Sequence, residues 1–172
     1  GRLDVLGTNR LGRALFSPLH LSPVVADAPG GPVNHARFAF LDPRADDFFT
    51  DWHTVAADIV AVLRTEAGRS PRDRTLTGLV GELSTRSEAF RTRWAAHDVR
   101  LHRTGTKRFR HPVVGDLTLT YEVLDLTADP GQALVVYGAE PGTPSADGLS
   151  LLATWTATPR QEDEGAQERP WS

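Results

Sequence analysis

The residues best able to do chemistry gather in one stretch, HDVRLHRTGTKRFRHPVVGDL, at positions 97 to 117. No acidic residue lies between Arg100 and Val114. The histidines are His97, His102 and His111, and the basic residues are Arg100, Arg103, Lys107, Arg108 and Arg110. Such side chains could hold a metal ion, contact nucleic acid, or form a cationic strand of a sensor domain.

The spacing of the histidines argues against a metal site. His102 follows His97 by five positions and His111 follows His102 by nine, and only His97 is expected on a helix. Zinc sites usually pair ligands three to five residues apart or place two histidines on one helical face. The sequence also has no cysteine, which excludes thiolate sites and disulfides. We therefore expect no metal and no cofactor, and histidines that are solvated or hydrogen-bonded for structural reasons.

Nucleic-acid binding by residues 100 to 110 has limited support. Clustered cations can support salt-sensitive binding to phosphates. Only Phe109 interleaves with them as a stacking aromatic, and no helix-turn-helix, zinc-finger or RNA-recognition pattern is present. The net charge of −3 makes the basic stretch a local feature of a mildly acidic chain. A solvated strand face explains the charges more simply.

The sequence does not indicate an enzyme. The Gly-x-Ser-x-Gly pattern that places a nucleophilic serine on a sharp turn is absent. His97 and Asp98 are neighbours along the chain, whereas catalytic dyads and triads converge in space. No glycine-rich loop with a lysine follows a predicted strand, because Gly78 and Gly81 fall inside a helical pattern. We expect no catalytic residues.

One helical face could line a ligand pocket. Phe90, Trp94 and His97 lie at positions i, i+4 and i+7. They could be core residues with His97 capping the helix, where its charge favours the helix dipole. Alternatively, the two rings could line an apolar cavity whose polar end, Arg91 or His97, holds an acidic head group. Both interpretations bury the same rings and differ in whether a void remains.

The helices and strands that position these residues are predicted from the hydrophobic period and from the glycines and prolines that interrupt it. We expect an α+β fold in which helices pack over one face of an antiparallel sheet. Helices are expected at 10–16, 35–41, 52–67, 74–86, 88–97 and 145–155, with a short helical piece at 43–49 and with Gly68 ending the helix at 52–67. Strands are expected at 3–8, 99–111, 116–124 and 133–140, with a bulge at Gly105 and a mobile loop at 21–33. In the strand at 116–124, Tyr121 points inward, and Asn9 can cap the first helix.

The length fits one domain, residues 1–157, followed by a polar tail at 158–172 that we expect to be disordered. The chain begins with Gly1 and not with Met, so we expect it to be part of a longer protein. No apolar run reaches the ~18 residues that a membrane span requires. We expect no membrane partner and a cytoplasmic location.

Several long stretches resemble a known family in order and spacing. They are FLDPRADDFFTDW, LVGELSTRSEAFRTRWAAHDVR, GTKRFRHPVVGDLTLTYEVL and LVVYGAEPGTPSADGLSLLA. Together with LDVLGTNRLGRALF they resemble the C-terminal ligand-binding domain of the MmyB-like helix-turn-helix transcription regulators, over residues 3 to 154. The family's Arg-x-x-Trp-x-x-His-Asp-Val segment, its Thr-Gly-x-Lys-type strand and its His-Pro-x-x-Gly turn are all present. They appear as Arg91, Trp94, His97, Asp98 and Val99, then Thr104, Gly105, Thr106 and Lys107, then His111, Pro112 and Gly115.

The resemblance implies a PAS-like fold and an effector-sensing role in an actinobacterial-type repressor or activator. In this family an N-terminal helix-turn-helix domain binds DNA, and the PAS-like domain is associated with long-chain fatty acids. The sequence departs from the family at three places. The helix-turn-helix domain is absent from this sequence. The parent protein would bind DNA only through that domain, so we expect this fragment not to bind operator DNA alone. A strand that precedes the segment matching LDVLGTN is also missing, which would expose a sheet edge, and residues 21–33 look like an insertion.

Three hypotheses follow. The first is a sensor domain that holds a fatty-acid-like ligand between helices and sheet. Phe90, Trp94 and Tyr121 would form the apolar wall, Arg91 or His97 would receive the carboxylate, and Asn9 would brace the pocket or merely cap its helix. The second is an interaction module whose sheet or exposed edge forms a homodimer. The third is direct nucleic-acid binding by residues 100 to 110.

Overall fold

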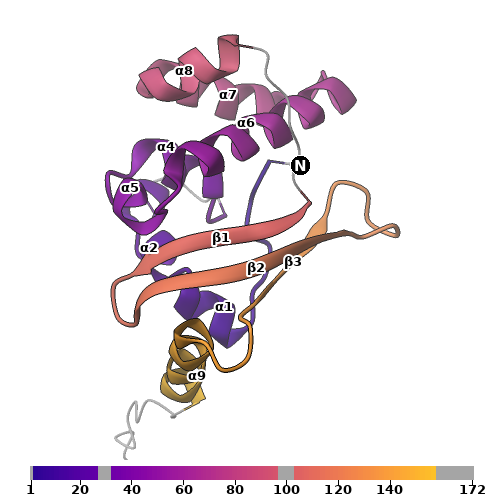
Figure 1. Cartoon of the computed structure of the whole chain (residues 1–172). Coiled ribbons are helices and arrows are strands. Elements are labelled where there is room, and N and C mark those ends of the chain that lie inside the picture. The colour runs from indigo at the N-terminus through magenta and orange to yellow at the C-terminus, as the bar shows by residue number, and fades with distance from the viewer. Residues whose placement is uncertain (1, 27–31, 97–102, 158–172) are drawn as a thin grey trace, which may run out of the picture.

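The computed structural model packs helices against one face of an antiparallel sheet (Figure 1). It describes residues 2–26, 32–96 and 103–157. Within these ranges the helices are α1 (Arg10–Leu15), α2 (Ser17–His20), α3 (Pro23–Ala26), α4 (His35–Leu41), α5 (Arg44–Phe48), α6 (Trp52–Arg69), α7 (Arg74–Arg86), α8 (Glu88–Ala95) and α9 (Pro144–Ala157). The predicted α+β fold is confirmed. The tail predicted to be disordered, 158–172, lies outside the described residues.

Three strands form the sheet in the described part of the chain. They are β1 (Thr104–His111), β2 (Gly115–Asp125) and β3 (Ala133–Gly138), in the order β1-β2-β3 with both pairings antiparallel. The register places Phe109 opposite Leu117, and Tyr121 opposite both Gly105 and Tyr137. This is the meander of short connections that the sequence predicts.

The two faces of the sheet differ because successive side chains point to opposite sides. On the helix-covered face, Phe109, Leu117 and Leu119 are at most 1% exposed. On the other face, Arg108 and Arg110 are exposed along with the β2 threonines. None of the described helices covers that second face, which is called the open face below.

Aromatic rings join the helices to the covered face. Phe16, at the junction of α1 and α2, meets Phe109 edge-on at 5.7 Å between ring centroids and Tyr137 at 5.4 Å. Phe48 of α5 lies 5.3 Å from Phe109. Such ring contacts each contribute about 0.5–1.5 kcal/mol beyond simple burial. At the other end of the sheet, α9 comes close to β2 at Gly148, where an added Cβ would lie 2.8 Å from Leu117.

Two expectations near the N-terminus are wrong. Residues 3–8 form no sheet strand, because their backbone pairs locally with residues 33–35. Val5 N–H donates to the Val33 carbonyl at 2.8 Å, and His35 N–H donates to the Leu3 carbonyl at 3.0 Å. The expected loop at 21–33 contains α3, which begins at Pro23, a residue suited to the first helical turn. Residues 27–31 lie outside the described residues.

Two glycines also differ from expectation. Gly68 does not end its helix, because α6 continues to Arg69 and is capped by Ser70. Gly105 causes no bulge, since β1 pairs with β2 without interruption from Thr104 to His111. Its role is spatial: an added Cβ would lie 3.3 Å from Tyr121 Cε1, so the missing side chain leaves room for that ring.

A buried carboxylate fixes the turn between α4 and α5. Asp42 is 5% exposed and accepts hydrogen bonds from Ser22 Oγ at 2.5 Å and from Arg44 Nη2 at 2.6 Å. Arg44 Nε and the Arg44 backbone N–H also donate to it, at 3.0 and 2.9 Å. The Arg44 guanidinium and these donors hold the pKa of Asp42 down to about 2. The charged carboxylate is therefore the form that stabilises this turn.

We expect Asp42→Asn to lower the free energy of unfolding at pH 7 by about 1–3 kcal/mol, because buried donors lose a charged acceptor. The folded-state pKa lies below the unfolded one, so the stabilisation is present above about pH 4 and disappears as the pH falls toward 2. Urea unfolding at pH 7 and pH 3 measures this, and the difference from wild type should shrink at pH 3. Asp46→Asn, at an exposed acid of α5, is the control. Equal losses in both variants would contradict the role of Asp42.

Candidate functional site

The predicted aromatic face lies on α8. Ser87 caps the helix by accepting a hydrogen bond from Phe90 N–H at 3.2 Å, as the sequence predicts. Phe90 is fully buried and stacks on Trp94 with ring centroids 5.5 Å apart and an angle of 16°. Phe40 of α4 meets Phe90 edge-on at 5.0 Å. Phe90 and Trp94 therefore do share one packed face.

That face does not cover the sheet. α8 packs against α6 and α7, and α6 lies between α8 and β1 (Figure 1). The expectation that the aromatic face of α8 rests on the meander is thus wrong. The hydrophobic period of a helix shows that one of its faces is buried, but it does not show which element buries that face. α6 is buried on several sides and occupies the layer next to the sheet.

Cation–ring contacts join α6 and α8. Arg64 of α6 places its guanidinium 4.8 Å from the Trp94 ring centroid, and its Nε is buried without a hydrogen-bond partner in the described ranges. Arg93 lies over Trp52 at 4.8 Å. Arg91 is exposed on α8. His97 lies outside the described residues.

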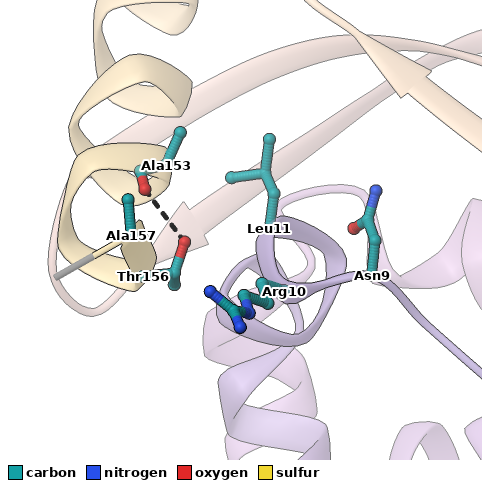
Figure 2. Close-up of a pocket in the computed structure, with 6 residues that line it drawn as sticks. All are labelled: Asn9, Arg10, Leu11, Ala153, Thr156 and Ala157. Carbon is teal, nitrogen blue, oxygen red and sulfur yellow. Dashed lines mark hydrogen bonds between the residues drawn. The ribbon is translucent and has the colours of Figure 1, made fainter. Parts of the chain in front are cut away.

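Asn9 belongs to another region. Its side chain accepts a hydrogen bond from Gly12 N–H at 2.6 Å, so it caps α1 as predicted. It also lines an open groove of about 320 Å³ between α1 and α9 (Figure 2). The other lining residues are Arg10, Leu11, Ala153, Thr156 and Ala157. This groove is separate from the rings of α8 and from Tyr121.

Tyr121 lies on the helix-covered face of the sheet, among polar groups. The Lys107 ammonium is 4.7 Å from its ring centroid, and Lys107 Nζ is 3.8 Å from Asp58 Oδ2 of α6. The Tyr137 ring lies 6.3 Å from the Tyr121 ring. Lys107 keeps 21% and Asp58 keeps 15% of their side-chain surface exposed. A cation, an anion and two phenols thus meet between α6 and the sheet, and we call these four residues the inner polar cluster.

Burial shifts the ionisation of these groups. It raises the pKa of both tyrosines, with the Asp58 charge adding to the effect. Burial lowers the pKa of Lys107, and the Asp58 carboxylate opposes that change. Nearby, burial lowers the pKa of His35 to about 4, with Lys107 and His20 contributing, so its imidazole is neutral at pH 7. His35 meets Phe16 edge-on at 5.2 Å, next to Tyr137.

The basic stretch of the sequence divides between the two faces. On the open face Arg108 pairs with Asp51 at 2.5 Å and Arg110 pairs with Asp116 at 3.7 Å. Arg103 pairs with Asp125, the last residue of β2. Acidic partners thus offset the three arginines of this stretch that the structure describes. This arrangement fits a solvated strand face better than a surface for phosphates.

His111 is held as a structural residue. It is 2% exposed, its Nε2 lies 3.0 Å from the Ala14 carbonyl, and its Nδ1 lies 3.2 Å from Val113 N. The carbonyl requires a donor and the backbone N–H requires an acceptor, so the proton is on Nε2. In the described ranges no three potential ligands come together to hold a metal ion.

The sequence contained signals for the inner polar cluster that the predicted site did not use. Lys107 is the single lysine among 19 basic residues, and it alternates with Arg108 and Arg110 along one strand. In a half-buried strand, that alternation places Lys107 on the same side as Phe109. Asp58, Tyr137, His35 and Arg64 carried no comparable signal, because their meeting depends on tertiary packing.

We expect Phe90→Ala to lower the free energy of unfolding by about 3–5 kcal/mol, since the variant removes a fully buried ring from between α8 and α4. Arg91→Ala, one position along and exposed, should change it by less than about 0.5 kcal/mol. Urea unfolding followed by circular dichroism measures both. A small loss for Phe90→Ala would mean that α8 is not packed as described.

Comparison with known families gives one match. The family model of the MmyB-like transcription regulator ligand binding domain matches residues 1–152. Comparison with curated proteins gives no match. In the described ranges, none of the helices combines the length and apolar character needed to cross a membrane. The chain belongs to the family of MmyB-like transcription regulator ligand binding domains.

Proposed function

We propose that this domain binds a fatty-acid-like small molecule between α6 and the helix-covered face of the sheet. In the whole regulator, binding there would alter how a helix-turn-helix domain engages DNA. Membership of the family supports an effector-sensing domain of a transcription regulator. The ligand class and the location of the site are our proposal, and so is a cytoplasmic setting.

One observation carries the location. Tyr137 and His35 lie half-buried among aromatic rings, yet the hydrogen bonds found in the described part of the chain leave the Tyr137 hydroxyl and the His35 ring nitrogens unused. Among the described residues, the one side-chain nitrogen or oxygen that is both buried and without a partner is Arg64 Nε. The unused atoms of Tyr137 and His35 are not in that class, so they keep some contact with solvent. Buried polar groups normally find partners in protein or water. Unused polar atoms among these rings therefore favour a space that water fills and that a ligand could take.

The predicted binding residues divide accordingly. Tyr121 contacts the proposed site directly. Phe90 and Trp94 would affect binding indirectly, through α6, since they pack against the side of α6 that faces away from the sheet. The contributions of Arg91, His97 and Asn9 stay predictions that binding measurements on their variants can test.

An acyl chain suits the surroundings. Phe109 and Leu119 are fully buried beside the inner polar cluster, and Tyr121 and Tyr137 add ring faces. Each buried methylene gains roughly 0.8 kcal/mol before ordering costs. A narrow slot along these side chains would be enough for micromolar affinity, which requires about 8 kcal/mol.

We expect native mass spectrometry of the purified chain to show a bound aliphatic acid, and titration with C12 to C18 fatty acids to be saturable. A ligand present at 100 times its Kd should raise the free energy of unfolding by about 2.7 kcal/mol. Short-chain acids such as butyrate are the control for non-specific effects. Absence of both co-purified lipid and saturable binding would refute the proposal.

A second candidate function, homodimerisation, is favoured by the outer edge of β3. Leu134, Val135 and Val136 are 53%, 44% and 47% exposed. The strand ALVVYG carries no charge, so two copies could pair there without like charges meeting. The interaction would bury these three side chains and satisfy the edge backbone groups.

Light scattering over a range of concentrations tests this second function. We expect a concentration-dependent dimer that Val136→Lys shifts toward monomer, because a charge on β3 would be buried in the pair. Thr106→Lys, on the open face of β1 at the opposite edge, should leave the equilibrium unchanged. A chain that stays monomeric throughout, or a dimer indifferent to Val136→Lys, would rule out pairing through β3.

A further inference from the structure

The arginines of this domain fall into two groups. Those that have an acidic partner among the described residues are Arg2, Arg37, Arg44, Arg86, Arg103, Arg108 and Arg110. Arg69, Arg72 and Arg74 are exposed, and in the described part of the chain their side chains make no ion pair, hydrogen bond or ring contact. The other arginines without any of these contacts are spread over α1 and α8. Unpaired guanidinium groups are therefore concentrated between residues 69 and 74.

A tight turn joins α6 to α7 at this point. Asp73 N–H donates to the Ser70 carbonyl at 3.0 Å, which closes the turn. Pro71 takes the second position of the turn, which its fixed φ suits. Ser70 N–H donates to the Glu66 carbonyl at 2.8 Å, so the turn is also bonded to the end of α6. Arg72, at the third position, projects from a backbone that hydrogen bonds hold in place.

Arg69 and Arg74 flank Arg72 closely. Arg69 is the last residue of α6 and Arg74 is the first residue of α7. The ends of a turn closed in this way lie less than about 7 Å apart. We call Arg69, Arg72 and Arg74 the arginine turn. Its three charges are presented together on an ordered backbone, which reduces the entropy lost when a partner binds.

The acids of the same segment are committed elsewhere. Asp73 caps α7 by accepting hydrogen bonds from the backbone N–H groups of Thr75 and Leu76, at 2.9 and 3.1 Å. Its other oxygen lies 3.5 Å from Arg2. Glu66 accepts a hydrogen bond at 3.2 Å from the serine hydroxyl at the start of the turn. Neither acid pairs with the arginine turn, so its positive charge is left for a partner.

Helix stability does not explain two of the three arginines. Arg69 lies at the carboxyl end of α6, where a cation is favourable. Arg74 opens α7, and a cation at that positive end of a helix is unfavourable. Arg72 belongs to neither helix. A phosphate placed here would be attracted both by the guanidinium groups and by the amino end of α7. The arrangement thus suits an anionic partner better than the isolated domain.

We propose that the arginine turn contacts the phosphates of double-stranded DNA without reading base sequence. The chain belongs to a family of transcription regulator domains, and DNA carries one charge per ~1.7 Å of its axis, so three clustered cations can meet several phosphates. A guanidinium also matches a phosphate with two parallel hydrogen bonds. The arginines of residues 103–110 are less suited, because acids already pair with them. This role goes beyond ligand sensing and does not depend on it.

The first experiment measures the fluorescence anisotropy of a labelled DNA duplex with the purified chain over a range of KCl concentrations. Three phosphate contacts predict a slope of about −2.7 for log K against log[KCl], or binding about 40-fold weaker at ~200 mM than at ~50 mM. The triple variant Arg69→Gln, Arg72→Gln, Arg74→Gln should bind at least about 10-fold more weakly at ~50 mM and lose most of the slope. A second duplex of unrelated sequence should bind wild type equally.

A matched control separates the arginine turn from net charge. The variant Arg103→Gln, Arg108→Gln, Arg110→Gln also loses three positive charges, so both variants change the net charge from −3 to −6. This control should keep the wild-type slope and lie within about 2-fold of wild-type affinity, while circular dichroism shows that both variants are folded. Absence of salt-sensitive binding by wild type, or equal losses in the two variants, would overturn the proposal. Binding to phosphatidylserine vesicles but not to the duplex would assign the turn to a lipid surface instead.

A measurement on the wild-type chain removes dependence on the variants. Phenylglyoxal modifies exposed guanidinium groups, and mass spectrometry of the digested chain locates each modified arginine. Duplex DNA at low salt should protect Arg69, Arg72 and Arg74, while Arg91, which is exposed on α8, should react as fast as without DNA. Unchanged reactivity of the arginine turn in the presence of bound DNA would show that the contact lies elsewhere.

Discussion

The two-residue period of β1 is the constraint on which the domain depends. It turns Phe109 toward Phe16 and Phe48 and thereby attaches the helices to the sheet. The same period turns Arg108 and Arg110 outward, where charge is easily hydrated. A shift of one residue would bury two guanidinium groups and expose the ring at the centre of the core. The register is therefore strongly determined, and Lys107 is inside because Phe109 is.

Features encoded within a few residues could be predicted from the sequence. Asn9 and Ser87 cap their helices through contacts three residues away. The alternation along β2 gave its inward side chains, among them Leu117, Leu119 and Tyr121, because one face of the sheet is dry and the other is not. The family resemblance supplied the regulatory role, which no local pattern encodes.

Features that depend on distant partners could not be predicted in this way. The stripe of Phe90 and Trp94 shows that one face of α8 is buried, but the identity of its neighbours depends on how α6 and α7 pack beside it. Residues 3–8 have a strand-like composition, yet their hydrogen-bond partners lie near Val33. Gly105 suggested a bulge, and only the facing Tyr121 ring explains why a side chain is excluded there.

If a ligand binds at the inner polar cluster as proposed, the position of the cluster would link binding to regulation. Asp58 belongs to α6, whereas Lys107, Tyr121 and Tyr137 belong to the sheet, so the cluster spans the two layers. A ligand can shift a conformational equilibrium only by as much as it prefers one state. An acid that engages the sheet residues replaces an attraction between the layers with one of its own. The spacing of α6 from β1 would then respond to the ligand, and α6 carries α8 with it through the Arg64–Trp94 contact.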